Sequence, residues 1–379
     1  MSNETPTLPP LQCQISGSVP RVQSASDPIF KECLKNERPC VIENSTFSKS
    51  LMCLSTDFLS EHLHDIPMTT FGSLHNRFMY SNEEKNEGKY YFRNPVYTFD
   101  MPFKEYAKCA RKCDNKNQQD GYPTDLLLSR KVYNNDIDTD NKEEGMQNSK
   151  FFYCQTVLPV GVGKPVQEAL SDIEWLFLKD CKVDNAWGKM KSTVLWASQR
   201  GCVTQCHYDE CHNIMAHIQG EKRFILFHPH NFDSMYPFPK HHAADRQSQV
   251  NFYAPQTDLY PKHGEAVAVE ALLNPGDVLY LPPYWWHHVE TLTESVGMNF
   301  WFEIAPFNMA TLKFPLTDEQ VIGVRRNLEK FLANVVPPRE IGKFLRTITL
   351  NRWETVEAET EEYEANKKDE QHKPQPPQQ

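Results

Sequence analysis

The alternation of polar and apolar residues between positions 203 and 304 constrains the fold more than any other feature of the sequence. In "GMNFWFEI" (297–304) two sets of residues alternate, Asn299, Trp301 and Glu303 against Met298, Phe300, Phe302 and Ile304. Side chains two apart lie on one face of a strand, so this segment presents one apolar and one partly polar face. Further strand patterns are "NIMAHI" (213–218), "KRFILF" (222–227), "VEALLN" (269–274) and "VLYLP" (278–282). We predict an all-β core, with a hairpin across Gln219-Gly220-Glu221.

Other patterns flank this core. Short strands are expected at 39–44 and 68–73, and apolar residues recur at helical spacing in 57–66 and 165–180. The expected fold class is therefore mainly β with flanking helices.

After the core, apolar residues recur at the three- and four-residue spacing of an α-helix. Thr317 and Gln320 form a capping-box pair that predicts a helix start, and Pro337-Pro338 predicts its end. The apolar stripe between them consists of Val321, Val324, Leu328, Phe331, Leu332 and Val335. A second short helix is expected over 339–350.

Composition divides the chain into expected parts. Residues 1–28 are rich in Ser, Pro and Thr and predict a loosely held arm before a main domain at 29–305. Within that domain, 110–150 is dominated by Asn, Asp, Lys and Gln, which predicts a mobile surface insertion. The helical region at 306–353 follows, and the acidic, Pro- and Gln-rich segment 354–379 predicts a disordered tail.

Charge and cysteine usage bear on the partners of the chain. Lys and Arg total 40 against 50 for Asp and Glu, and a net charge of −10 argues against nucleic-acid binding. The first residues are polar and no apolar run is long enough to span a bilayer, so we expect a soluble intracellular protein with no membrane partner. The eleven cysteines have no regular spacing, which favours reduced thiols over a disulfide framework.

The segment "TQCHYDECHN" (204–213) is rich in metal-ligand residue types. On a strand, His207 and Asp209 share a face while Tyr208 points away. A third ligand is available in "PPYWWHHVE" (282–290), from His287 or His288. Two histidines and one carboxylate around a metal leave one side open, as in non-haem Fe(II) oxygenases. The alternatives are a chance His-x-Asp pair and a zinc site formed by Cys202, Cys206, Cys211 and His212, although no Cys-x-x-Cys pair is present.

Five motifs in the same order give this chain a family resemblance. They are "TQCHYDECHN", "QGEKRFILFHP", "DRQSQVNF", "NPGDVLYLPPYWWHHVE" and "MNFWF". Together they resemble the JmjC-type 2-oxoglutarate oxygenases, specifically the factor-inhibiting-HIF asparaginyl hydroxylases, over residues 20–353 apart from 110–150. The resemblance implies a double-stranded β-helix (jelly-roll, cupin) core with C-terminal dimerisation helices. It also implies an enzyme that uses Fe(II), with 2-oxoglutarate and O2 as co-substrates.

The resemblance also assigns site residues. The implied metal ligands are His207, Asp209 and His287, with no catalytic group beyond them, while His288 points to the opposite face. The implied co-substrate residues are Tyr153, Thr204, Asn213, Lys222, Asn299 and Trp301. Among these, Lys222 would pair with the far carboxylate of 2-oxoglutarate, assisted by the hydroxyls of Tyr153 and Thr204.

On the substrate side, the resemblance implies that Tyr80, Arg246 and Gln247 hold the amide of a target asparagine. The implied substrates are hypoxia-inducible factor α and ankyrin-repeat proteins, and the implied state is a homodimer in the cytoplasm and nucleus. Two residues depart from the family: Cys211 replaces a glutamine near the substrate amide, and Trp196 replaces a leucine that lines the co-substrate pocket. Alternative functions are a JmjC lysyl hydroxylase or demethylase, and a non-catalytic cupin-like binding module.

Overall fold

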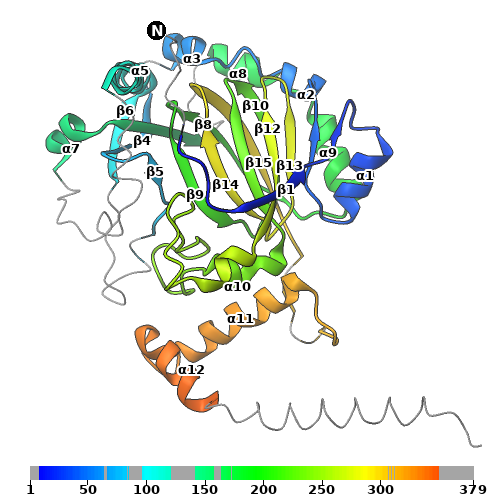
Figure 1. Ribbon diagram of the computed structural model, residues 1–379. Helices are drawn as coiled ribbons and strands as arrows, with labels where there is room; N and C mark the ends of the chain where they lie inside the picture. Colours follow the sequence, from blue (N-terminus) through cyan, green and yellow to red (C-terminus); the bar gives the residue numbers. More distant parts are fainter. Residues whose placement is uncertain are drawn as a thin grey trace, which may run out of the picture. The chain divides into compact units, whose positions relative to one another are not determined.

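Two β-sheets form the centre of the chain (Figure 1). The computed structural model describes residues 8–63, 66–82, 84, 96–120, 141–157, 164–171, 173–305, 307–308, 310 and 312–349. The six-stranded sheet has the order β1 (Gln14–Ser18), β12 (Val267–Leu273), β11 (Lys222–Phe227), β14 (Trp286–Thr291), β9 (Val203–Tyr208) and β5 (Arg77–Phe78). The nine-stranded sheet has the order β2 (Arg21–Val22), β3 (Cys40–Ile42), β13 (Val278–Leu281), β10 (Cys211–Gln219), β15 (Ser295–Glu303), β8 (Met190–Ser198), β7 (Phe151–Val157), β4 (Pro67–Ser73) and β6 (Tyr97–Pro102).

From β9 to β15, consecutive strands belong to opposite sheets, except that β11 and β12 are neighbours in the six-stranded sheet. The chain changes sheet between β9 and β10, β10 and β11, β12 and β13, β13 and β14, and β14 and β15. This is the path of a jelly roll, so the predicted β-sandwich with flanking helices is confirmed.

The predicted hairpin across Gln219-Gly220-Glu221 is wrong. Strand β10 pairs with β13 and β15, whereas β11 pairs with β12 and β14, so the turn passes from one sheet to the other. Gly220 makes this sharp reversal possible, because its φ is +77° and a Cβ atom there would overlap the Glu294 carbonyl. A tight turn between two apolar strands has the same sequence pattern whether the strands pair or separate.

The helices of the first part of the chain are α1 (Pro28–Lys35), α2 (Thr46–Lys49), α3 (Thr56–His62), α5 (Phe103–Asp120), α7 (Lys142–Asn148), α8 (Lys164–Ser171), α9 (Trp175–Asp184) and α10 (Phe232–Met235), with 3₁₀ turns η2 (Pro229–Asn231) and η3 (Pro261–Glu265). Several cover the outer face of the nine-stranded sheet, where Phe47 of α2 lies between Phe177 of α9 and Phe300 of β15 at ring distances of 4.9 and 5.3 Å. The helix predicted over 165–180 is two helices, α8 and α9.

Two compositional predictions need correction. The loose arm predicted over 1–28 contains β1 and β2, which pair with β12 and β3, and it runs into the start of α1. The insertion predicted over 110–150 begins within α5, where Ala110 and Asn117 are buried, and ends with α7. The pairing of β1 and β2 depends on backbone groups, which every residue has, so composition does not predict it. The helix α5 needs only a few apolar residues on one face, and these do not stand out in a polar segment. Residues 121–140 and the predicted tail at 354–379 lie outside the described residues.

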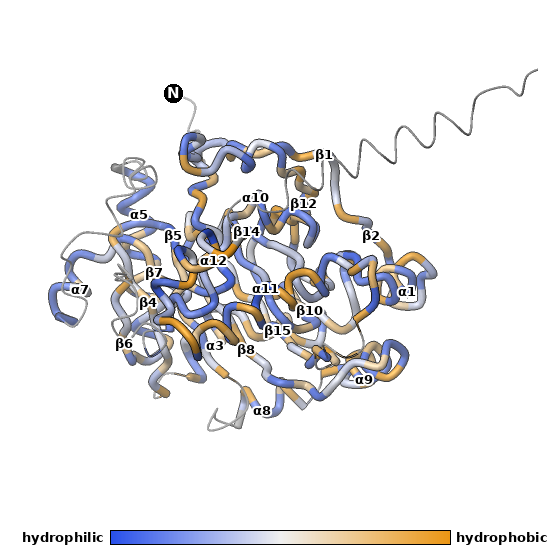
Figure 2. The backbone as a smooth tube through the Cα atoms, turned by 90° about the horizontal axis from the view of Figure 1, so that it is seen from below, coloured by the Kyte–Doolittle hydropathy of each residue, from blue (hydrophilic) through white to orange (hydrophobic). Residues whose placement is uncertain are grey.

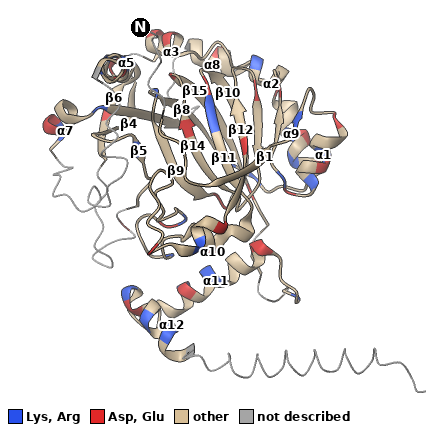
Figure 3. Cartoon of the chain, viewed as in Figure 1, with Lys and Arg blue, Asp and Glu red and all other residues tan. Residues whose placement is uncertain are grey.

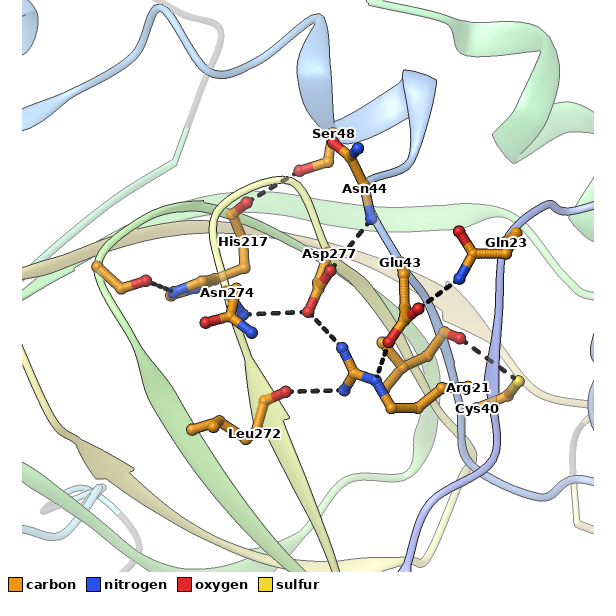
Figure 4. Close-up of polar contacts among 12 residues, drawn as sticks. Arg21, Gln23, Cys40, Glu43, Asn44, Ser48, His217, Leu272, Asn274 and Asp277 are labelled. Carbon is orange, nitrogen blue, oxygen red and sulfur yellow. Dashed lines mark hydrogen bonds and ion pairs between the residues drawn. The ribbon is translucent and has the colours of Figure 1, made fainter.

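A buried carboxylate fastens the Pro-Gly-Asp turn between β12 and β13 to the N-terminal strands (Figure 4). The Asp277 side chain accepts hydrogen bonds from the backbone N–H groups of Asn44 and Asn274, both at 3.1 Å. It also forms an ion pair with Arg21 at 2.8 Å, and Arg21 bonds to Glu43 as well. Both oxygens of this buried acid therefore accept hydrogen bonds, which stabilises the turn.

Hydropathy and charge vary along the described elements. Hydrophobic and hydrophilic residues interleave along the described backbone (Figure 2), and none of its helices combines the length and apolarity needed to cross a membrane. The sheets are mostly neutral, whereas helices such as α1 and α11 (Asp318–Leu332) carry charges of both signs, and α12 (Ile341–Thr349) carries only basic charges (Figure 3).

The chain divides into two compact units, Met1–Val324 and Arg325–Gln379. The predicted capping pair at the start of α11 is confirmed, since the Thr317 N–H donates to Gln320 at 3.1 Å and the Gln320 N–H donates to Thr317 Oγ1 at 3.3 Å. The second unit contains the rest of α11, the 3₁₀ turn η5 (Pro338–Glu340) and α12. It exposes Leu328, Phe331 and Val335 of the predicted apolar stripe. Dimerisation through these helices stays a prediction.

Candidate metal centre

His207, Asp209 and His287 come together at the meeting of β9 and β14. His207 and His287 are directly opposite each other in the strand register, and their ring centroids are 4.1 Å apart. Asp209 follows the last residue of β9. One potential ligand atom from each of the three lies within 4.8 Å of the others. The predicted triad is therefore present as a geometric unit.

The backbone fixes the orientation of both imidazoles. Nδ1 of His207 lies 2.8 Å from the Gln205 carbonyl, and Nδ1 of His287 lies 3.0 Å from the Trp285 carbonyl. A carbonyl only accepts, so each Nδ1 carries the proton and each Nε2 keeps its lone pair for a metal. Burial lowers the pKa of His287, and burial together with the neighbouring His287 lowers the pKa of His207 to about 3. Both rings are therefore neutral ligands near pH 7.

Two side chains donate hydrogen bonds to Asp209. Arg246 donates to its Oδ1 and the indole N–H of Trp301 donates to its Oδ2, both at 3.2 Å. Burial alone would raise the pKa of Asp209, but His207, His287, Arg246 and Trp301 together hold it below its usual value. The carboxylate is thus ionised and oriented. The sequence placed Trp301 only in a pocket wall and Arg246 only at the substrate, so it missed both contacts to Asp209.

The donor set fits a divalent first-row metal. Two neutral imidazoles and one carboxylate supply three ligands and a single negative charge, which suits iron better than a hard ion such as Mg²⁺. In the described part of the chain, the four residues of the zinc alternative do not gather: Cys202 Sγ bonds the Phe152 carbonyl and His212 stacks on Trp187 at 4.4 Å. His288 points away from the triad, as expected, and packs on Phe252 at 5.2 Å.

A cavity of about 510 Å³ lies beside the triad. Five of the predicted site residues line it: Tyr80, Tyr153, Thr204, His207 and Gln247. Its other walls include Phe71, Phe78, Asp100 and Trp196. Two predicted substrate residues and two predicted co-substrate residues therefore share one space with a metal ligand.

Lys222 is a buried cation without a counter-ion. Leu226 is paired directly with His287, so Lys222, four residues earlier on β11, lies on the same inner face of the sheet as that ligand. The described residues offer its ammonium no hydrogen bond or ion pair. Burial lowers the pKa of Lys222 to about 8, although Cys202 opposes the shift. An unpartnered ammonium in a protein interior is costly, and an anionic ligand would remove that cost.

The two predicted asparagines are partners of each other. Nδ2 of Asn299 donates to Oδ1 of Asn213 at 2.9 Å, and both side chains are buried on the inner face of the nine-stranded sheet. They do not line the 510 Å³ cavity, and neither do Lys222 or Trp301.

Trp196 lies at the boundary between these two groups of residues. Its ring lies 5.4 Å from the ring of Tyr153 and 6.1 Å from that of Trp301. The indole therefore neighbours one residue that lines the cavity and one that does not. The other departure from the family, Cys211, is also buried, and burial raises the pKa of its thiol.

Comparisons with known proteins agree with this geometry. The sequence profile of the cupin-like domain family matches residues 26–308. The chain is 34% identical over 108 residues to Jumonji C domain-containing protein 5 of Drosophila melanogaster, and 34% identical over 115 residues to lysine-specific demethylase JMJ30 of Arabidopsis thaliana. It is 30% identical over 131 residues to human HSPB1-associated protein 1. These matches cover 28%, 30% and 34% of this chain and 27% of each relative.

Proposed function

Because the chain belongs to the cupin-like domain family, we propose that it is a JmjC-type oxygenase that requires Fe(II) and 2-oxoglutarate and acts on a protein side chain. The observation that carries this proposal is the triad of His207, Asp209 and His287. Iron held there would supply the redox chemistry that couples oxidative decarboxylation of 2-oxoglutarate to oxidation of a second substrate by O2.

The roles of the chain's own residues follow from their contacts. His207 and His287 would bind the metal through Nε2, because their Nδ1 atoms are engaged with the backbone. Trp301 and Arg246 hold the Asp209 carboxylate toward the same point. Three protein ligands would leave further positions at a bound iron for the 2-oxo acid and O2.

We further propose that Lys222 receives the far carboxylate of 2-oxoglutarate. Its unpartnered ammonium on the inner face that also carries His287 supports this role. Tyr153 and Thr204 interact through their side chains and both line the cavity, which supports a shared role for their hydroxyls at that carboxylate.

For the substrate, the comparisons favour the lysyl alternative over the asparaginyl prediction. Two of the relatives, JMJ30 and JMJ31 of Arabidopsis thaliana, are named lysine-specific demethylases. The cavity beside His207 combines the aromatic rings of Phe71, Phe78 and Tyr80 with the carboxylate of Asp100. Aromatic faces and an acid suit a lysyl or methyl-lysyl cation. We therefore propose a lysyl side chain as the preferred target.

Asparaginyl hydroxylation is the second candidate. Gln247 lines the same cavity and donates through Nε2 to the backbone carbonyl of Tyr80. Its amide oxygen is left to accept from the NH2 group of a target asparagine. Hypoxia-inducible factor α and ankyrin-repeat proteins are the substrates to test for this candidate, with a cytoplasmic and nuclear homodimer as the proposed form.

Mass spectrometry of peptide libraries separates the two candidates. Iron-loaded protein with 2-oxoglutarate is expected to oxidise or demethylate lysyl peptides faster than ankyrin-repeat asparaginyl peptides. Succinate release should follow product formation and should vanish without Fe(II). Faster turnover of the asparaginyl peptides would reverse the substrate assignment. Iron-bound protein that converts neither class, and releases no succinate, would instead indicate a cupin-like binding module.

Trp196→Leu is expected to lower the KM for 2-oxoglutarate by about tenfold. We propose that 2-oxoglutarate reaches Lys222 only when the indole of Trp196 moves away from Tyr153 and Trp301. Each aromatic contact that is lost costs about 0.5–1.5 kcal/mol, and the smaller leucine would remove this cost. Titration of 2-oxoglutarate at saturating peptide measures the change. Trp175→Leu, at a half-exposed position on α9, is the matched control. An unchanged or higher KM in Trp196→Leu would show that the indole does not obstruct binding.

A further inference from the structure

A second group of metal-ligand side chains lies apart from the triad. One potential ligand atom from each of His228, His230 and Asp318 lies within 4.8 Å of the others. His228 directly follows β11, His230 lies in η2, and Asp318 is the first residue of α11. The cluster therefore joins two segments that are far apart in the sequence but both lie in the first compact unit.

The geometry of this cluster is held by its neighbours. Nδ1 of His228 lies 3.5 Å from Oδ2 of Asp318 and 2.8 Å from Nδ1 of His230. The His228 ring packs edge-on against Trp285 at 5.1 Å, and Asn231 Nδ2 donates to His230 Nε2 at 3.1 Å. The donor atoms are thus fixed at a common point on a partly exposed surface.

The charge of the cluster is unbalanced. Among the described residues, His228 is the only basic side chain within 4.0 Å of the Asp318 carboxylate. Burial, and then the neighbouring His230, lower the pKa of His228, so this ring is neutral near pH 7. The other charges that act on His228 are Arg38 and Glu319, which have opposite signs. A carboxylate beside two imidazole nitrogens attracts a divalent cation.

We propose that His228, His230 and Asp318 form a second metal site, suited to Zn²⁺, that links the segment after β11 to the first turn of α11. Two imidazole nitrogens and one carboxylate oxygen are zinc ligands, and a water would complete the tetrahedron. The ion would replace a single imidazole–imidazole hydrogen bond with three ligand bonds, and so would stabilise the start of α11.

Metal binding requires one proton to move on His230. Because Nε2 of His230 accepts from Asn231, its Nδ1 carries the proton donated to His228. Coordination through both Nδ1 atoms transfers that proton from Nδ1 to Nε2 of the same ring. The Asn231 amide would then turn its oxygen toward Nε2. The proton stays on the protein and no oxidation is involved.

Zinc titration of the full chain tests this site once the triad is disabled. The background variant is His207→Ala with Asp209→Ala, which removes two ligands of the first site. Calorimetry is expected to find one bound Zn²⁺, and the melting temperature should rise by about 2–5 °C at saturating Zn²⁺. In the same background, Co²⁺ should give the visible absorption of a tetrahedral site.

Three further substitutions in that background locate the ion. His230→Gln and Asp318→Asn should each weaken Zn²⁺ binding by at least about tenfold. Glu319→Gln, which removes the adjacent acid of the same helical turn, should leave the affinity unchanged. Circular dichroism confirms that each variant is folded. Absence of bound Zn²⁺ in the background variant, or full affinity in both His230→Gln and Asp318→Asn, would overturn the proposal.

Discussion

Lys222→Met is expected to make the protein more stable and to abolish 2-oxoglutarate turnover. The wild-type ammonium is buried without a partner among the described residues. Methionine fills a similar volume without a charge, and replacing an unpaired buried charge removes its desolvation cost. Because the same ammonium is proposed to bind the far carboxylate of 2-oxoglutarate, its loss should reduce affinity by about 100-fold or more.

The pH dependence of unfolding gives the sign of this effect. Burial lowers the pKa of Lys222 from its ordinary value of 10.5 to about 8. At a pH between these two pKa values, the Lys222 amine is protonated in the unfolded chain and neutral in the folded chain. The contribution of Lys222 to the free energy of unfolding therefore rises with pH. Below pH 8 the full destabilisation is present, at most about 3 kcal/mol. Lys222→Met should therefore raise the melting temperature most near neutral pH, and less as the pH approaches 10.5.

Lys240→Met is the matched control. Lys240 forms an ion pair with the buried Asp245 at 2.8 Å, so its replacement removes the positive charge that faces a buried acid and should destabilise the protein. Opposite shifts of the melting temperature in the two variants would support the assignment. A Lys222→Met protein that is less stable than wild type, or that keeps its affinity for 2-oxoglutarate, would show that the ammonium has another partner.

The metal ligands were the part of the site that the sequence predicted best. His207 lies on β9 and Asp209 directly follows the strand, so the predicted strand alternation, which puts side chains two apart on one face, was a sufficient guide to the pair. The choice of His287 over His288 came from the family resemblance, and the strand register supports it because His287 lies opposite His207. The alternation of side chains between the two faces of a strand can be predicted from a sequence, because it depends only on positions close together in the chain.

Contacts between distant segments could not be predicted in this way. The carbonyls of Gln205 and Trp285 orient the two ligands, but any residue has a carbonyl, so the sequence gives no signal for them. The sheet change at Gly220 depends on which strands pair, and neither strand specifies its partner locally. The His228, His230 and Asp318 cluster was also missed, although His-Pro-His was visible, because its acid comes from another element.

Asp209→Asn is expected to lower the metal affinity by about 100-fold or more and to remove peptide oxidation. The amide keeps the shape of the side chain and can still accept from Trp301, but it loses the only negative charge among the three ligands. Neutral oxygen is a much weaker ligand for a divalent ion, and even residues that only orient ligands change affinity by 10–100-fold. Titration with Fe(II) under anaerobic conditions, or with Mn²⁺ as a redox-inert substitute, measures the loss.

Glu210→Gln is the control for charge, since it removes a carboxylate at the neighbouring position that does not belong to the triad. Its metal affinity and succinate release should match those of the wild type. The same Asp209→Asn substitution should leave the melting temperature of metal-free protein within a few degrees, because the Trp301 contact survives and only the Arg246 pair is weakened. If Asp209→Asn binds Fe(II) as tightly as wild type, the metal is held elsewhere, and the oxygenase assignment loses the geometry on which it rests.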